Sequence, residues 1–503
     1  MFHHSNAMPS RRDFLRRTGQ LALGSAAMPL ALNLAAIGQA AAFNAPGGDY
    51  KALVCVFMYG GNDYANTVVP YDNASYDQYS TIRGGGAGRT AGGIALAQAD
   101  LTATLLNPTV APVDTLGVPR QFALHPSMTG LAGLFNAGQA AVQLNVGPLV
   151  KPLSRADYNS SNRTLYPRPP QLFSHNDQSS IWQSSSPEGS KIGWGGNMGD
   201  LVLPSAGGPN TNAVFTGISV AGNTVFLSGD SALQYQVTTS GAIKIKPATN
   251  SSVYGSTALP AALKALVQQT SPTNHKLEND YNAVTRRAID AEAAVTTALS
   301  EAPLATTFAS DNLSQQLKMV ARLIKGRASL GVRRQVFFVS IGGFDLHDNL
   351  IAQHPALLGN VSAALTAFYN ATVELGLGNA VTTFTASDFG RTLSSNGDGS
   401  DHGWGSHHFV VGGAVNGKAF YGTPPPVSVS DNKTAGVYDA AAKWHVGQGR
   451  LLPSTSVDQY AATMAKWFGV DPATEMTGVL PNIANFGVTY DGVSYPTDLG
   501  FMA

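Results

Sequence analysis

The chain of 503 residues carries 31 basic and 31 acidic side chains, so its formal net charge is zero, and only 12% of its residues are charged. This balance offers no basic surface to a nucleic acid, and a hydrophobic content of 44% argues against a disordered chain. The single cysteine, Cys55, excludes an intrachain disulfide and a cysteine-rich zinc site. The length allows one large α/β domain or several smaller ones.

The first 42 residues have the layout of a twin-arginine export signal. Arg11 and Arg12 precede a run rich in Leu and Ala over about residues 21–37, and residues 39–42 offer a small-residue cleavage site. Gly, Asn and Pro dilute the apolar run, which disfavours the alternative of a short membrane anchor. We therefore expect a periplasmic or secreted protein with no membrane span after signal removal, and a single domain over residues 43–503.

The first segment of the mature chain, Ala52–Met58, is a continuous apolar run of the kind found in strands that are covered on both faces. Cys55 lies inside it and is expected to be buried. Two glycines follow, and Asp63 comes directly after the turn that they allow. A helix ending near Ala137 and a second buried strand, Ala140–Val146, are expected next.

Ser174 and His175 precede a predicted helix. The Ser174 hydroxyl group could lie at the positive end of that helix and act as a nucleophile, or it could simply cap the helix. Residues 203–257 alternate short apolar runs with Gly, Ser and Asn, which predicts a small β-rich insert of antiparallel strands that forms a cap or an edge sheet. Helices are expected over Glu278–Leu299 and Leu313–Ile324.

Two further strands end in acidic turns. Val336–Ile341 leads into a second Gly-Gly-X-Asp turn that carries Asp345 and His347, and Val381–Ala386 leads into Asp388 and Arg391. A helix over Ala356–Leu375 connects them, and a Gly-rich loop then delivers Asp401 and His402. Because open α/β sheets bind ligands at the carboxyl ends of their strands, we expect these side chains to meet there. His354, His407 and His408 are interpreted as exposed, and His125 as a residue that caps local structure. A last helix is expected over Val457–Phe468.

Carboxylates and imidazoles together suit zinc, manganese, magnesium or calcium. One divalent metal could be held by Asp345, His347 and His402, and a second by Asp63, Asp388 and Ser174. Two such ions can stabilise both the attacking and the leaving oxygen of a phosphoryl or sulfuryl transfer. Arg391 could contact an ester oxygen, since its fork fits oxyanions, or it could form an ordinary salt bridge.

Several motifs together resemble the exported bacterial family known as domain of unknown function 1501, over about residues 50–485. They are Gly60-Gly61-Asn62-Asp63, Leu124-His125-Pro126, Gly342-Gly343-Phe344-Asp345-Leu346-His347, Asp388-Phe389-Gly390-Arg391-Thr392 and Asp401-His402-Gly403. That family looks like a branch of the alkaline phosphatase and sulfatase superfamily. The resemblance implies a three-layer α/β/α sandwich with a mostly parallel sheet.

The resemblance also implies roles for individual residues. Asp63, Asp345, His347, Asp388 and His402 match metal-ligand positions of the superfamily, and Ser174 matches the position of the nucleophile. Phe389 stands where a metal ligand is usual.

The sequence therefore predicts an exported metal-dependent hydrolase of phosphate or sulfate esters, with one or two divalent ions and with Ser174, His175 and Arg391 as catalytic residues. Its substrate would be a small molecule or a glycan ester. The alternative is an inactive protein of the same fold that binds an envelope protein or a glycan in an assembly role.

Overall fold

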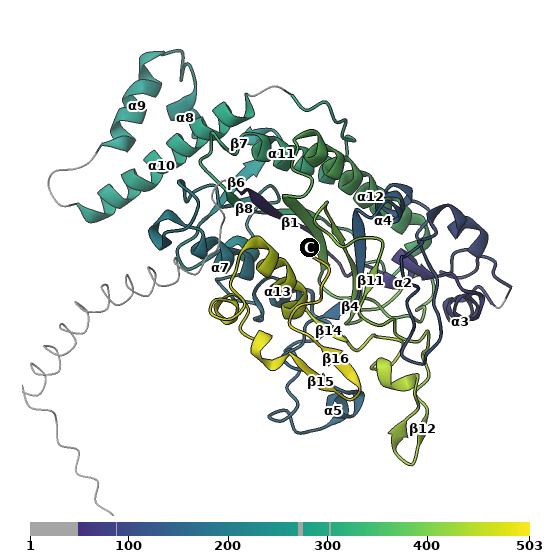
Figure 1. Ribbon diagram of the computed structural model, residues 1–503. Helices are drawn as coiled ribbons and strands as arrows, with labels where there is room; N and C mark the ends of the chain where they lie inside the picture. The colour runs from purple at the N-terminus through teal and green to yellow at the C-terminus, as the bar shows by residue number, and fades with distance from the viewer. Residues whose placement is uncertain (1–48, 87, 270–274, 301–302) are drawn as a thin grey trace, which may run out of the picture.

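The computed structural model describes residues 49–503, except residues 87, 270–274 and 301–302. A sheet of ten strands lies at its centre, in the order β11-β4-β10-β9-β1-β8-β5-β6-β7, with β14 pairing beside β4 (Figure 1). The predicted export signal, residues 1–42, lies outside the described residues.

The middle of the sheet is parallel. β1 (Lys51–Met58) pairs in parallel with β8 (Arg334–Ile341) on one side and with β9 (Val381–Ser387) on the other. β10 (Ser406–Val411) runs antiparallel between β9 and β4 (Ala140–Gly147). The two-residue strands β11 (Phe420–Tyr421) and β14 (Thr455–Ser456) both pair in parallel with β4.

Helices cover both faces of this sheet. Alternate side chains of β1 point to opposite faces, as the pleat of a strand requires. Ala52, Val54 and Val56 pack in one core with the helices α4 (Thr129–Asn136), α11 (Asn312–Lys325) and α12 (Leu350–Glu374). Leu53, Cys55 and Phe57 pack in a second core with α6 (His175–Ser184), α7 (Trp194–Leu201) and α13 (Val457–Phe468). The predicted fold class, a three-layer α/β/α sandwich with a mostly parallel sheet, is confirmed.

The antiparallel pairing predicted within residues 203–257 is wrong for the longer segments. β5 (Gly217–Ser219) pairs in parallel with β8, and β6 (Gln234–Thr238) pairs in parallel with β5, so both extend the main sheet. Val225–Leu227 forms the short 3-10 helix η3 and not a strand, and Phe226 packs there against Trp194 of α7 with ring centroids 4.6 Å apart. Only the short β7 (Gly241–Ala242) is antiparallel to its neighbour.

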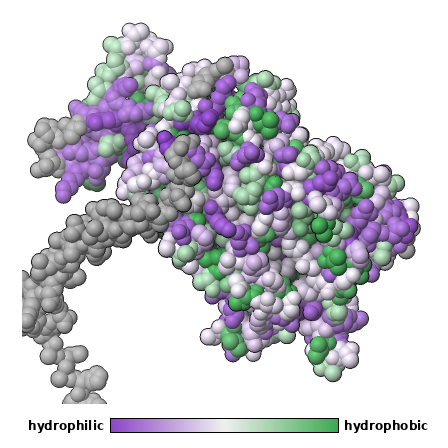
Figure 2. Space-filling view, viewed as in Figure 1, coloured by the Kyte–Doolittle hydropathy of each residue, from purple (hydrophilic) through white to green (hydrophobic). Residues whose placement is uncertain are grey.

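Beyond this edge, the helices α8 (Lys246–Thr249), α9 (Ala258–Gln268) and α10 (Lys276–Leu299) project from the body of the molecule (Figure 1). Hydrophobic and hydrophilic residues are interspersed on the described part of the face drawn in Figure 2. None of the helices in the described ranges has the length and apolar character that a membrane crossing needs. The remaining elements are α2 (Tyr64–Thr67), β2 (Val68–Pro70), α3 (Asn73–Arg83), η1 (Gln98–Thr104), β3 (Phe122–Leu124), α5 (Arg155–Asn159), η2 (Pro204–Ala206), β12 (Lys433–Thr434), β13 (Val437–Tyr438), η4 (Ala442–Trp444), α14 (Met476–Val479), η5 (Ile483–Asn485), β15 (Val488–Tyr490) and β16 (Val493–Tyr495).

Three histidines interpreted as exposed are buried. α12 begins at Leu350, before the predicted start at Ala356, so His354 turns inward and its Nε2 lies 3.1 Å from Asn62 Oδ1. Burial lowers the pKa of His354 to about 3. His407 and His408 lie on β10, inside the sheet, because this strand begins earlier than the apolar run indicates.

Candidate metal centre

The site lies where β1, β8 and β9 end side by side, and glycines allow the turns there to touch. Gly60 and Gly61 have φ values of +115° and +79°, a region that favours glycine. A Cβ atom on Gly60 would meet the backbone nitrogen of Asp345 at 2.3 Å. The Gly-Gly sequence after β1 is therefore required for the close approach of the turn that carries Asp345.

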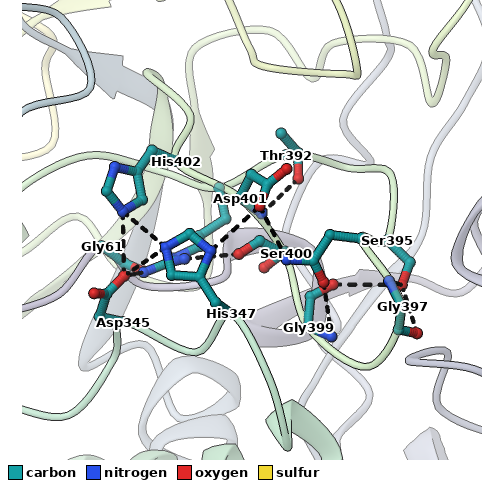
Figure 3. Close-up of polar contacts among 12 residues, drawn as sticks. Gly61, Asp345, His347, Thr392, Ser395, Gly397, Gly399, Ser400, Asp401 and His402 are labelled. Carbon is teal, nitrogen blue, oxygen red and sulfur yellow. Dashed lines mark hydrogen bonds and ion pairs between the residues drawn. The ribbon is translucent and has the colours of Figure 1, made fainter.

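Four side chains of types that can ligate a metal converge at this edge. His175 comes from the first turn of α6, Asp345 and His347 follow β8, and His402 comes from the loop before β10. Figure 3 shows His347 and His402 directed toward the carboxylate of Asp345. His402 Nε2 lies 3.1 Å from His175 Nε2 and 3.0 Å from His347 Nε2. The structure thus brings together the predicted trio of Asp345, His347 and His402 and adds His175, which was predicted as a catalytic residue.

The spacing of His175, Asp345 and His402 suits three ligands of one ion, because their donor atoms all lie within 4.8 Å of one another. Asp345 Oδ2 lies 3.4 Å from His175 Nε2, and Asp345 Oδ1 lies 3.2 Å from His402 Nε2 and 3.1 Å from His347 Nε2. A tetrahedral ion with ligands at about 2.05 Å separates those ligands by about 3.3 Å. His175, Asp345 and His402 are therefore near the separations that one such ion would impose, and His347 lies beside Asp345 and His402.

Each imidazole is oriented by an acceptor at its other nitrogen. Nδ1 of His175 lies 2.6 Å from Asp388 Oδ2, Nδ1 of His347 lies 3.2 Å from Asp401 Oδ1, and Nδ1 of His402 lies 2.8 Å from the carbonyl oxygen of Phe173. An acceptor at Nδ1 favours the tautomer with its proton there and leaves a lone pair on Nε2. Three lone pairs then face one another and a carboxylate, an arrangement that a cation stabilises.

The charges around the centre shift the pKa values of its members. The hydrogen bond to Asp388 raises the pKa of His175 above 6.5, while burial lowers the pKa of His402. Burial acts to raise the pKa of Asp345, but its ion pair with Arg391 outweighs this and holds the pKa below its usual value. Asp345 is therefore ionised at neutral pH and available to a cation.

Arg391 lies beneath the site rather than facing a substrate. It is fully buried, and its guanidinium group donates to the carbonyl oxygens of Gly60, Gly61 and Ser400 and to Asp345. Its N–H groups are directed at these four acceptors, whereas the sequence predicted that they could contact an ester oxygen. It fixes the turn after β1 against Asp345.

Asp388 also lies behind the donors. One oxygen atom accepts from Gly60 N at 3.0 Å as well as from His175, and the other accepts from Ser179 Oγ at 2.9 Å. This places Asp388 as the carboxylate that orients His175, where the sequence predicted a metal ligand.

The second predicted ligand set does not assemble. Asp63 is buried, and its carboxylate accepts from Arg83 at 2.7 Å, from Ser400 Oγ at 2.6 Å and from Asn66 N at 2.9 Å. Burial acts to raise the pKa of Asp63, but Arg83 leads the groups that lower it below its usual value. Ser174, the residue before α6, donates its hydroxyl proton to Asp177 at 2.8 Å. Neither residue contacts the four donors by any described hydrogen bond or ion pair.

Phe389 fills the place next to the centre where a further ligand was expected. Its ring is buried and lies 4.8 Å from the ring of His175 and 4.6 Å from that of His402, measured between centroids. A Cβ atom on Gly61 would lie 2.4 Å from this ring. Phe389 therefore forms an apolar wall beside the imidazoles.

A cavity of about 510 Å³ opens beside the donors and includes His175, Asp345 and Asp388 in its lining. Tyr59 lies on one wall, and burial raises its pKa to about 12. Residues of α6 and of the segment before η3 form the other wall. The exposed face of Asp345 thus adjoins a space that can take a small molecule.

Sequence reasoning missed Arg83, which compensates Asp63, and the cavity residues Glu188 and Asn223. Arg83 lies on a polar helix in a Gly-rich region, and its spacing from Asp63 carries no motif. His175 was predicted as a catalytic residue and not as a metal ligand. Its position at the first turn of a helix was the signal that could have marked it as a ligand.

A family model described as "Protein of unknown function (DUF1501)" matches residues 50–477. No curated protein matches the chain. Similar solved structures include Ps i-CgsB in complex with k-i-k-neocarrahexaose, at 10% identity and a TM-score of 0.32, covering 87% of this chain and 77% of that one. PsFucS1 sulfatase from Pseudoalteromonas sp. has 9% identity and a TM-score of 0.27, covering 80% of this chain and 74% of that one.

Proposed function

This chain belongs to the family described as protein of unknown function (DUF1501), as its motifs predicted, and we propose that it is an exported metal-dependent hydrolase of phosphate or sulfate esters. One observation carries the proposal. His175, Asp345 and His402 offer donor atoms that lie within 4.8 Å of one another at the rim of an open cavity, and Nε2 of a third imidazole, that of His347, lies 3.0 Å from His402 Nε2. The residues that would hold the ion are His175, Asp345, His347 and His402.

The donor set favours zinc over magnesium or calcium. Three imidazole nitrogens and one carboxylate oxygen are typical zinc ligands, whereas magnesium and calcium take oxygen ligands almost alone. When bound, such an ion supplies Lewis-acid polarisation of an ester oxygen and activates water near neutral pH. One ion is proposed, because Asp63 is already neutralised by Arg83.

The residues of this chain contribute orientation and proton control. Asp388 keeps a proton on Nδ1 of His175, and Asp401 does the same for His347. The ring of Phe389 excludes water from one side of the imidazoles. Because Ser174 Oγ is bonded to Asp177, water is the proposed nucleophile.

Metal analysis of the mature protein, combined with a panel of aryl phosphate, phosphodiester and sulfate esters, tests the proposal. We expect about one zinc per chain and turnover that is lost in His175→Ala and Asp345→Ala. Ser174→Ala should keep both metal and turnover, and its loss of turnover would make Ser174 the nucleophile instead. A metal-free protein with no turnover refutes the proposal.

A second candidate is a metal-stabilised binding protein of the cell envelope. The observation that favours it is that His347 lies beside His175, Asp345 and His402 as a possible fourth protein donor, since structural zinc sites are closed by four ligands and catalytic sites keep a position open. In that case zinc would be present and would raise the melting temperature, but none of the esters would be turned over.

A further inference from the structure

The cavity beside the metal centre has a charge character that restricts its occupant. Among the described residues that line it, none is lysine or arginine, and Glu188 joins Asp345 and Asp388 as a third acidic residue. Asn176, Gln183 and Asn223 line it with amides. A second anionic group of a ligand would therefore find uncharged dipoles and carboxylates there instead of a cationic side chain.

The two arginines near the centre, Arg391 and Arg450, contact other groups of the protein. Arg391 is enclosed by carbonyl oxygens and Asp345. Arg450 donates from Nε to the carbonyl oxygen of His402 at 2.8 Å, and its guanidinium group lies 5.5 Å from the centroid of the Phe173 ring. Neither belongs to the cavity lining.

Five charged side chains lie at the centre. Three carboxylates, those of Asp345, Asp388 and Asp401, accompany two guanidinium groups, those of Arg391 and Arg450. With neutral imidazoles, a divalent ion would leave the centre with one net positive charge. That charge matches one negative charge on a ligand, and a second would remain unmatched next to Glu188.

We propose that the site selects esters that carry a single negative charge, namely sulfate monoesters or phosphate diesters, over doubly charged phosphate monoesters. The selection rests on the proposed hydrolase function and assigns its substrate class. The α6 N-terminus beside the centre adds only about half a positive charge, which does not compensate a second full negative charge. The amides of Asn176 and Asn223 suit an uncharged, hydrogen-bonding alcohol part of the ester.

Calorimetry with two matched ligands that resist hydrolysis tests the selection without relying on turnover. Zinc-loaded protein is titrated with phenylphosphonate, at a pH where it is doubly ionised, and with its singly charged monomethyl ester. We expect the monoester to bind about tenfold more tightly or better, because the second charge meets no partner. Glu188→Gln should narrow the difference, while the matched control Glu188→Asp should keep it.

Turnover then separates the two ester types. p-Nitrophenyl sulfate and methyl p-nitrophenyl phosphate are compared with p-nitrophenyl phosphate, and at least one of the first two should have the higher kcat/KM. Tighter or equal binding of phenylphosphonate, or preferred turnover of p-nitrophenyl phosphate, overturns the selection and leaves the hydrolase proposal standing. Absence of bound metal and of all turnover overturns the hydrolase proposal itself.

Discussion

Replacing Asp388 by Asn isolates the contribution of the carboxylate that orients His175. Asn has nearly the same shape, so its carbonyl oxygen can still accept from His175 Nδ1 and Gly60 N, and its amide group can donate to Ser179 Oγ. The substitution removes the negative charge and keeps the three hydrogen-bonded partners of Asp388, with the direction of the bond to Ser179 reversed.

The expected magnitude follows from the geometry of this pair. The contact measures 2.6 Å, and the Asp388 side chain is 2% exposed, so solvent screens the interaction little. A hydrogen bond to a charged acceptor is roughly twice as strong as one to a neutral acceptor. Changes to such orienting carboxylates lower metal affinity by about 10- to 100-fold, which corresponds to about 1.4–2.8 kcal/mol. We expect a loss in this range for Asp388→Asn.

Competition with a chromogenic chelator measures the zinc affinity, and Asp401→Asn provides the matched control. The contact between Asp401 and His347 is longer, at 3.2 Å, and the Asp401 side chain is 38% exposed. The same change there should lower zinc affinity only about threefold or less, because exposed ion pairs contribute little. Because Asp388 raises the pKa of His175, protons should also stop competing with zinc at a lower pH in Asp388→Asn.

Two results would contradict this reasoning. If Asp388→Asn bound zinc as tightly as the wild type, Asp388 would not tune His175. If Asp401→Asn caused the larger loss, burial and contact length would not decide the strength of these pairs. The first result would mean that the centre does not depend on Asp388, and the second that it depends more on Asp401.

Three further predictions concern stability. Arg391→Met should lower the free energy of unfolding by about 3–5 kcal/mol in urea titrations, because it leaves buried carbonyl oxygens without a donor; a loss below 1 kcal/mol would contradict this. Burial raises the pKa of Asp458 from 3.8 to about 6. As far as it depends on this group, the free energy of unfolding therefore keeps its full value below pH 3.8, where the carboxyl is protonated in both the folded and the unfolded chain, and it falls as the pH rises through 6. Asp458→Asn should therefore stabilise the protein at pH 8 by about 1–3 kcal/mol and by nothing near pH 3.5, and an equal gain at both would be inconsistent with that pKa. Zinc at 100 times its Kd should raise the free energy of unfolding of the wild type by about 2.7 kcal/mol relative to the chelated protein. It should therefore raise the melting temperature of the wild type but not that of His175→Ala.

The sequence predicted the parallel middle of the sheet because buried strands read as continuous apolar runs, as in β1 and β8. It also predicted that Asp345, His347 and His402 would meet, since neighbouring strands of this kind end at one edge. The prediction of antiparallel pairing was wrong for β5, because a strand of three residues carries no sequence signal that distinguishes parallel from antiparallel pairing. The prediction of an exposed His354 was wrong because the helix was expected to begin at Ala356, whereas α12 begins at Leu350 and carries His354 into the interior.

The second predicted ligand set does not assemble, and the reason lies in pairing between residues that are separated in the sequence. Asp63 does end a strand, but whether such a carboxylate binds a metal depends on which cation reaches it in the fold. Here Arg83, 20 residues later, reaches it at 2.7 Å while fully buried. Phe389 packs against His175 and His402. Asp63 is thus paired with a guanidinium group, and the candidate donors that lie together are those of His175, Asp345, His347 and His402.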